Sequence, residues 1–267
     1  MSFAWNAVGH MVVANIAYQH LKPDVREKVD TLVTYMQQQY PDMSAFVHIS
    51  YWPDAIRYQK IETFTHWHYI DVAFSDDGTQ LKNLIDSDNA VWALKNIEMV
   101  VNNEGANPYE RVRFLSFLTH IVGDLHQPLH TVSRISAALP DGDRGGNDYY
   151  VFYNDTKVNL HHLWDIGVGE FDGDTSQSHI NAITQSIISR YPESYFATQV
   201  NQLDPESWVK EGMNNAKQYV YDTPQNQTVT SEYIEKGKEV SEQQAALAGY
   251  RLAKILNKLL GSSLHWH

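Results

Sequence analysis

The sequence predicts a mainly α-helical fold with one small β-hairpin, formed as a single domain. Apolar residues recur at helical spacing through most of the chain, and only residues 148–160 alternate in the manner of strands. No repeat, low-complexity linker or break in composition divides the 267 residues. With 43% hydrophobic residues, a chain of this length can bury one large core.

Three helices are expected in the first hundred residues. The first covers about residues 7–20. A second begins at Pro23 and runs to about residue 38, because proline favours the first position of a helix. Ser87 or Asp88 is placed to cap a third helix that runs to about residue 101.

Two further helices and the hairpin follow. Pro108 is expected to begin a helix that ends near residue 125. The turn of the hairpin is expected at Asn154 and Asp155, and loops are expected at residues 75–86 and 135–147. The last long helix carries an apolar stripe at i, i+4, i+7, i+8 and i+11, formed by Ala248, Leu252, Ile255, Leu256 and Leu259.

Composition excludes several classes of protein and of site. The chain has no cysteine, so any metal must be held by histidine and carboxylate, of which there are 13 His and 32 Asp plus Glu. The net charge is −12 without a basic run, which argues against a protein that grips duplex nucleic acid through many phosphates. No apolar run approaches the ~18 residues that a membrane span requires.

The stretch "HIVGDLHQPLH", residues 120–130, places ionisable groups in an otherwise apolar helix end. His120 and Asp124 are four residues apart and therefore share one helix face. Pro128 ends the helix, so His130 can turn back towards the same place. A hydrogen-bonded His–Asp pair in the core is the simpler explanation of the first two residues taken alone.

Further His and Asp residues favour a metal site over an isolated hydrogen-bonded pair in the core. His161 and Asp165 repeat the four-residue spacing, His68 precedes Asp71 by three, and other chemistry-bearing residues are Asp54, Arg57 and His10. Several such pairs in a chain without cysteine favour a site for more than one metal ion. Imidazole and carboxylate ligands suit zinc best among the common ions.

Six ordered motifs together resemble one known family. They are "WNAVGH", "WPDAIR", "HYID", "HIVGDLHQPLH", "GGN" and "LHHLWD", between residues 5 and 165. The set resembles the S1/P1 nucleases, zinc-dependent endonucleases that prefer single strands and also act as 3′-nucleotidases. The resemblance implies the helical fold that these enzymes share with zinc-dependent phospholipase C, and three Zn²⁺ ions per chain.

The resemblance also implies a distribution of ligands. One zinc ion would be held by Asp54, His68, His120 and Asp124. A second would be held by His130, His161 and Asp165. The third would be held by the backbone amine and carbonyl of Trp5, with His10 and Asp124. Three Asp and five neutral His leave such a site with a net charge of about +3, a cationic pocket in an acidic protein.

Supporting roles follow from the same resemblance, each with an ordinary structural alternative. Asp71 would orient or deprotonate water, Arg57 would stabilise phosphate charge, and Asp124 would bridge two metals. Tyr69 would stack a base, and Gly146 and Asn147 would form a loop that contacts a base edge. The alternatives are a carboxylate that fixes a histidine, a surface ion pair, core packing and a simple turn. The resemblance leaves His126 and His162 outside the ligand set, as supporting or surface groups.

The expected activity is hydrolysis of single-stranded DNA and RNA to 5′-phosphate products, and of 3′-mononucleotides. The rival interpretations are a zinc-dependent phospholipase C and a non-catalytic zinc-binding protein. The short gap from Trp5 to His10 and the final ligand Asp165 favour the nuclease. We expect a bacterial, secreted or periplasmic monomer without membrane association, its domain spanning residues 5–262 and followed by a tail at 263–267.

Residues 1–4 are expected to be a remnant of a signal peptide or residues added to the natural chain, because Ser2 and Ala4 are small residues at the positions that a signal peptidase reads. The nitrogen of the Ala4–Trp5 peptide bond is delocalised into the carbonyl and cannot bind zinc, whereas a free amine can. Cleavage after Ala4 should therefore raise zinc content and turnover on single-stranded DNA. Identical values for cleaved and uncleaved protein, with residues 1–4 verified by mass spectrometry, would contradict this role of Trp5.

Overall fold

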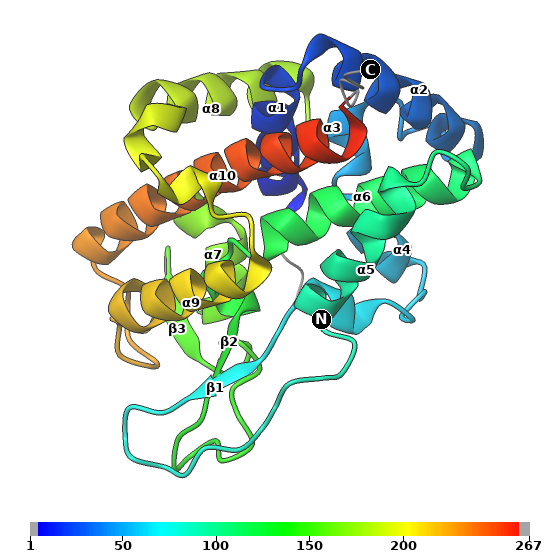
Figure 1. Ribbon diagram of the computed structural model, residues 1–267. Helices are drawn as coiled ribbons and strands as arrows, with labels where there is room; N and C mark the ends of the chain where they lie inside the picture. The colour runs from blue at the N-terminus through cyan, green and yellow to red at the C-terminus, as the bar shows by residue number, and fades with distance from the viewer. Residues whose placement is uncertain (1–4, 262–267) are drawn as a thin grey trace.

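The structure is a computed structural model that describes residues 5–261, and helices dominate it (Figure 1). The predicted boundaries at residues 4/5 and 262/263 therefore fall at or outside the limits of the described residues. The α-helices are α1 (Ala7–Gln19), α2 (Pro23–Gln39), α3 (Phe46–Ile49), α4 (Trp52–Tyr58), α5 (Ala90–Asn102), α6 (Pro108–Asp124), α7 (Leu160–Asp165), α8 (Gln177–Arg190), α9 (Pro205–Asn215) and α10 (Ser231–Leu260).

Short 3₁₀ turns and strands connect these helices. The 3₁₀ turns are η1 (Thr65–His68), η2 (Pro128–His130), η3 (Gly167–Gly169), η4 (Glu193–Phe196) and η5 (Gln199–Asn201), and a π turn, η6 (Ala216–Val220), follows α9. The strands are β1 (Val72–Phe74), β2 (Val132–Arg134), β3 (Tyr150–Tyr153) and β4 (Thr156–Asn159). The mainly helical fold class predicted from the sequence is confirmed.

The core forms where α1, α6 and α10 pack together (Figure 1). Residues 8–17 of α1 are buried on every face of the helix, which is the pattern of a central helix. The α10 helix buries the predicted apolar stripe, in which Leu259 is only partly buried. The second half of α6 is also buried, and its end at Asp124 lies inside the molecule.

The helix starts were predicted well, with one correction. Pro23 and Pro108 occupy first-turn positions as expected. The cap of α5, however, is Asn89 and not Ser87 or Asp88, because the Asn89 side chain accepts hydrogen bonds from the first backbone N–H groups of the helix. The Asp88 carboxylate instead binds His66.

The hairpin is confirmed, and a second small sheet was not foreseen. Asn154 and Asp155 both have positive φ, 48° and 59°, as a two-residue hairpin turn of type I′ requires. Strands β1 and β2 pair in parallel, with Val72 opposite Val132. Each has three residues, too few for alternation to be visible in the sequence. This pair places the segment after His68 beside the segment after His130.

The membrane expectation can be tested on the described helices. Within residues 5–261, none is both long and apolar enough to cross a bilayer.

The α10 helix carries one carboxyl group into the core at Glu242. Its side chain is almost fully buried, and its Oε2 atom has no hydrogen-bond partner among residues 5–261. Arg190 of α8 binds the other oxygen. Burial raises the pKa of Glu242 to about 7, and the nearby Glu170 carboxylate adds to the rise. The folded protein therefore disfavours the ionised form of Glu242.

The raised pKa predicts a pH-dependent effect of Glu242→Gln. An unfolded glutamate titrates near ~4.3, so between that pH and about 7 the folded state binds more protons than the unfolded state. The free energy of unfolding of the wild type thus falls as pH rises through this window. Glutamine does not ionise, so the variant should gain about 1–3 kcal/mol relative to wild type between pH 5 and pH 8.

Urea unfolding at both pH values measures this gain. Glu235→Gln on the exposed face of the same helix is the control and should show no such change. A difference between Glu242→Gln and wild type that does not vary with pH would contradict the argument.

Candidate metal centre

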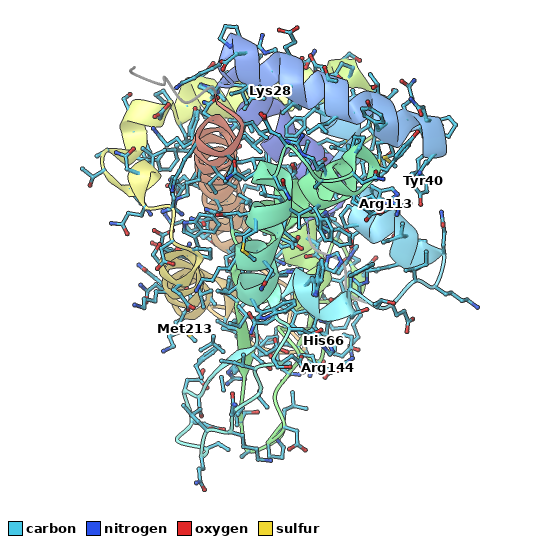
Figure 2. The ribbon with its side chains drawn as sticks, turned by 45° about the vertical axis from the view of Figure 1, so that its right-hand side comes forward. Lys28, Tyr40, His66, Arg113, Arg144 and Met213 are labelled. Atoms are coloured by element: carbon cyan, nitrogen blue, oxygen red, sulfur yellow. The ribbon has the colours of Figure 1, made fainter. Side chains whose placement is uncertain are left out.

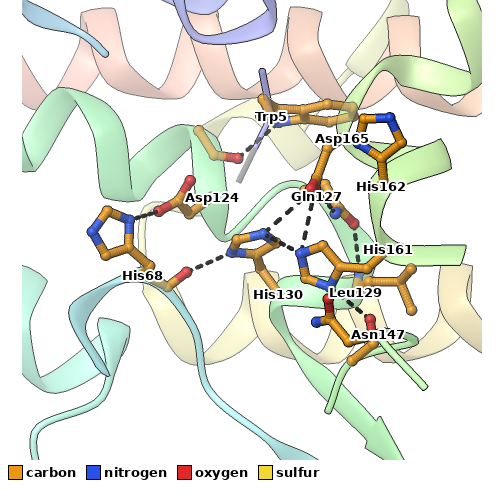
Figure 3. Close-up of polar contacts among 12 residues, drawn as sticks. Trp5, His68, Asp124, Gln127, Leu129, His130, Asn147, His161, His162 and Asp165 are labelled. Atoms are coloured by element: carbon orange, nitrogen blue, oxygen red, sulfur yellow. Dashed lines mark hydrogen bonds and ion pairs between the residues drawn. The ribbon is translucent and has the colours of Figure 1, made fainter. Parts of the chain in front are cut away.

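Eight ionisable side chains from six elements converge at the buried end of α6. Figure 3 shows His68, Asp124, His130, His161 and Asp165 among them. All eight are buried, with exposed fractions of 0–7%. We call them the His/Asp cluster: His10 from α1, Asp54 from α4, His68 from η1, His120 and Asp124 from α6, His130 from η2, and His161 and Asp165 from α7. These are the side chains that the sequence singled out as candidate ligands.

Asp124 is the centre of one half of the cluster. Its Oδ2 lies 3.2 Å from Nδ1 of His68 and 3.3 Å from Nε2 of His120, and its Oδ1 lies 3.2 Å from Nε2 of His10. The rings of His10 and His120 stack with centroids 3.8 Å apart. Two groups here are close enough to hold a metal ion, one formed by His10, Asp54 and His120 and one by His68, His120 and Asp124.

The other half contains His130, His161 and Asp165, which could hold a further ion. Oδ1 of Asp165 lies 3.4 Å from Nε2 of His161 and 3.7 Å from Nε2 of His130. The Nε2 atoms of the two histidines are 2.9 Å apart.

Backbone carbonyls fix the orientation of three rings. Nδ1 of His120 donates to Ser50 O at 2.7 Å, Nδ1 of His130 to His68 O at 2.6 Å, and Nδ1 of His161 to Gly145 O at 2.6 Å. A carbonyl only accepts, so Nδ1 carries the proton and Nε2 exposes a lone pair. The lone pairs of His130 and His161 therefore face one another and repel unless a cation lies beside them.

The cluster also contains buried polar atoms that form no hydrogen bond within the described part of the chain. Among residues 5–261, both ring nitrogens of His10, Nε2 of His68, Oδ1 of Asp54 and both oxygens of Asp124 are buried without a hydrogen bond. Each such atom costs about 1–3 kcal/mol. Nitrogen and carboxylate lone pairs left in this way suit the donor set that zinc prefers, so the residues fit a metal centre.

Burial is also the main cause of the pKa shifts in the cluster. Burial raises the pKa of Asp124 well above its usual value, and the Asp54 and Asp165 carboxylates raise it further. Burial also lowers the pKa of His10 and His68. The imidazoles of His10 and His68 are thus neutral, as metal ligands must be. The Arg57 guanidinium opposes the rise in the pKa of Asp124, but burial is the larger effect.

A cavity of about 350 Å³ opens onto the cluster. Arg57 lies at its inner side, 3.6 Å from the Asp54 carboxylate, and its side chain is 11% exposed. Burial raises the pKa of Asp71 to about 7. The cavity is lined by Arg57, His68, Tyr69, Asp71, Leu129, His130, Arg144, Asn147 and His161. The structure thus brings Tyr69, Asp71 and Asn147 together with the cluster, as expected.

The remaining candidate residues do not line this cavity. Gly146 does not line the cavity, and its carbonyl accepts the backbone N–H of His161. Trp5 is fully buried, and its indole donates to Gly123 O at 3.0 Å (Figure 3). His162 is exposed. His126 is buried away from the cluster, where it contacts Arg251.

The sequence analysis missed Gln127, which is fully buried. Its amide donates to Asp165 Oδ1 at 2.7 Å, and its carbonyl oxygen accepts from the backbone of Leu129 at 2.6 Å. Gln127 therefore orients one carboxylate of the cluster and shapes the turn that leads to His130. The signal was a lone amide in an apolar segment between two histidines.

A buried set of imidazoles and carboxylates at the base of a cavity, in a helical domain, defines the class of metal-dependent enzymes. The chain belongs to the S1/P1 nuclease family, whose model matches residues 5–261. The members of this family are nucleases, which are hydrolases, and the resemblance seen in the motifs is confirmed.

Similar proteins share little identity but nearly their whole length with this chain. Nuclease S1 of Aspergillus oryzae is 25% identical over 96% of this chain and 92% of its own. Endonuclease 2 of Arabidopsis thaliana is 24% identical over 96% of this chain and 91% of its own length. Nuclease P1 of Penicillium citrinum is 22% identical over 97% of this chain and 99% of its own length.

The close packing at Gly123 predicts that this glycine is required for the cluster. A Cβ atom there would lie 2.9 Å from Nδ1 of His10. Gly123→Ala must therefore displace the His10 ring from its stack on His120, at a cost of about 1–3 kcal/mol in the free energy of unfolding. Urea unfolding measures the cost. Gly105→Ala, on an exposed turn where the added atom meets only the Asn103 side chain, should have little effect; equal effects of the two changes would refute the argument.

Proposed function

We propose that this chain is a zinc-dependent endonuclease that hydrolyses single-stranded DNA and RNA to 5′-phosphate products and also removes phosphate from 3′-mononucleotides. The observation that carries the proposal is the set of buried atoms without a hydrogen bond on His10, Asp54, His68 and Asp124. This set adjoins a cavity lined by arginine and a carboxyl group. Membership of a nuclease family supports the reaction class.

The ligands proposed for zinc are the members of the His/Asp cluster. One ion would bind Asp54, His68, His120 and Asp124; a second would bind His130, His161 and Asp165; a third would bind His10, Asp124 and the backbone of Trp5. The close group of His130, His161 and Asp165 coincides with the second set, and the group of His68, His120 and Asp124 lies within the first. The remaining close group, His10 with Asp54 and His120, takes members from the first and third sets. When bound, clustered zinc supplies Lewis acidity that lowers the pKa of water and offsets charge on phosphate oxygens.

Two side chains of the cavity act on the phosphodiester. The Arg57 guanidinium, fixed beside Asp54, donates hydrogen bonds to a phosphate oxygen and balances the charge that develops there. Asp71 accepts a hydrogen bond from the attacking water and orients it, or takes its proton. Both side chains line the cavity onto which the cluster opens, which supports these roles.

The shape of the cavity supports a preference for single strands. The cluster is buried beneath a cavity of about 350 Å³, which is too small for a stiff duplex. A single strand can bend its phosphate inwards and stack a base on Tyr69, while Asn147 contacts a base edge. The net charge of −12 leaves the local metal charge as the main attraction for the backbone.

The proposal predicts which substrates are cleaved and what abolishes cleavage. The zinc-loaded protein should hydrolyse single-stranded DNA and RNA at least tenfold faster than paired DNA, and should leave phosphatidylcholine intact. Chelation should abolish activity and zinc should restore it. His161→Ala should lose bound zinc and most turnover, because it removes a ligand whose ring is held by Gly145 O.

The matched control is His162→Ala, a change to the exposed neighbour of His161. It should retain both zinc and turnover. Cleavage of phosphatidylcholine instead of nucleic acid would replace the nuclease with a phospholipase. Zinc binding without any hydrolysis would leave only a metal-binding protein.

A further inference from the structure

Arg144 is a second arginine of the cavity, and it lies at the outer side. Its side chain is 71% exposed, whereas that of Arg57 is 11% exposed. Both line the same cavity, with Asn147 beside Arg144. Apart from histidines, these two arginines are the basic residues that line the described cavity. The cavity therefore has one guanidinium next to the cluster and one where the bound chain would leave it.

The Arg144 guanidinium is held in place but keeps donors available. Nε and Nη2 donate to the two oxygens of Asp148 at 2.8 Å and 2.7 Å, a bidentate pair. These two bonds use two of the five N–H groups of an arginine. The N–H groups on the opposite edge, from Nη1 and Nη2, form a second fork that matches the oxygens of a phosphate.

The backbone of Arg144 is fixed as well. Its φ is +55°, an unusual value for a residue with a side chain. Its N–H donates to Ser133 Oγ at 3.1 Å, and its carbonyl accepts a bond of 2.7 Å from the Asn147 amide. The loop therefore sets the position of Arg144 relative to Asn147, the residue proposed to contact a base.

We propose that Arg144 binds the phosphate of a nucleotide next to the one being cleaved, and so favours polynucleotides over 3′-mononucleotides. The inference rests on the proposed nuclease function. Arg57 and the cluster occupy the inner end of the cavity, so the reacting phosphate belongs there. An anion that reaches Arg144 at the outer side must then be a second phosphate, which a chain has and a 3′-mononucleotide lacks.

The test compares Arg144→Ala with wild type on a single-stranded oligonucleotide and on a 3′-mononucleotide. On the oligonucleotide KM should rise about tenfold, equivalent to about 1.4 kcal/mol, with kcat unchanged. On the 3′-mononucleotide both constants should stay the same. The slope of log KM against log salt concentration should also fall by about 0.7, the value for one phosphate contact on a single strand.

Two further variants make the result specific. Arg144→Lys keeps the charge but not the fork, so it should keep the salt slope while KM rises less than with alanine. Arg113→Ala removes a partly exposed arginine that lies apart from Arg144 in Figure 2, and it should change neither substrate's KM.

Each contrary outcome is distinct. An unchanged KM for the oligonucleotide, or an equal rise for both substrates, would overturn the inference about Arg144 and leave the nuclease function standing. A wild-type protein without activity on either substrate would overturn the function itself, and the inference with it.

Discussion

The structure is organised around a carboxylate that the protein buries without giving it a hydrogen bond. Asp124 is fully buried at the end of α6, and both of its oxygens lack hydrogen-bond partners among the described residues. Three imidazoles surround it at 3.2–3.3 Å, from α1, η1 and α6 itself. A buried carboxylate without a hydrogen bond is costly, and the proposed metal ion would offset that cost. Gly123 lets α1 approach this end of α6, because a Cβ atom there would lie 2.9 Å from Nδ1 of His10.

The remaining elements hold the rings of the cluster in fixed orientations. Backbone carbonyls of Ser50, His68 and Gly145 each bind one ring nitrogen and so direct the other inwards. These carbonyls belong to short segments between helices, where backbone groups are not used by a helix ladder. The parallel pair of β1 and β2 holds the segment that follows His68 beside the segment that follows His130. Irregular structure near the cluster thus supplies the acceptors that a purely helical arrangement would lack.

Charge is distributed so that an acidic protein can attract an anionic chain. The overall charge is −12, and the positive charges at the cavity are Arg57, Arg144 and the proposed metal ions. The electrostatic field of these positive charges is therefore local, and it acts on a strand that has already reached the cavity. A protein with a basic surface would instead bind duplex nucleic acid without selection. Under the proposed function, the small cavity and the buried cluster would favour flexible strands over a stiff duplex.

The sequence by itself determined the features that depend on neighbours along the chain. The spacing of His120 and Asp124, and of His161 and Asp165, placed each pair on one helix face, since helical periodicity is local. Proline at residues 23 and 108 marked helix starts, and Asn154–Asp155 marked the hairpin turn, because backbone preference is also local. The absence of cysteine limited the possible ligands to histidine and carboxylate.

Only the tertiary structure decided which of these groups meet and how they are held. The fold brings His126 against Arg251, 125 residues away, and His130 against His161, 31 residues away. Gln127 orients Asp165 by a hydrogen bond, although the two residues are 38 positions apart in the sequence. The three-residue strands β1 and β2 form only because they find each other across the fold. Such pairings arise from packing between distant segments, and no local pattern in the chain encodes them.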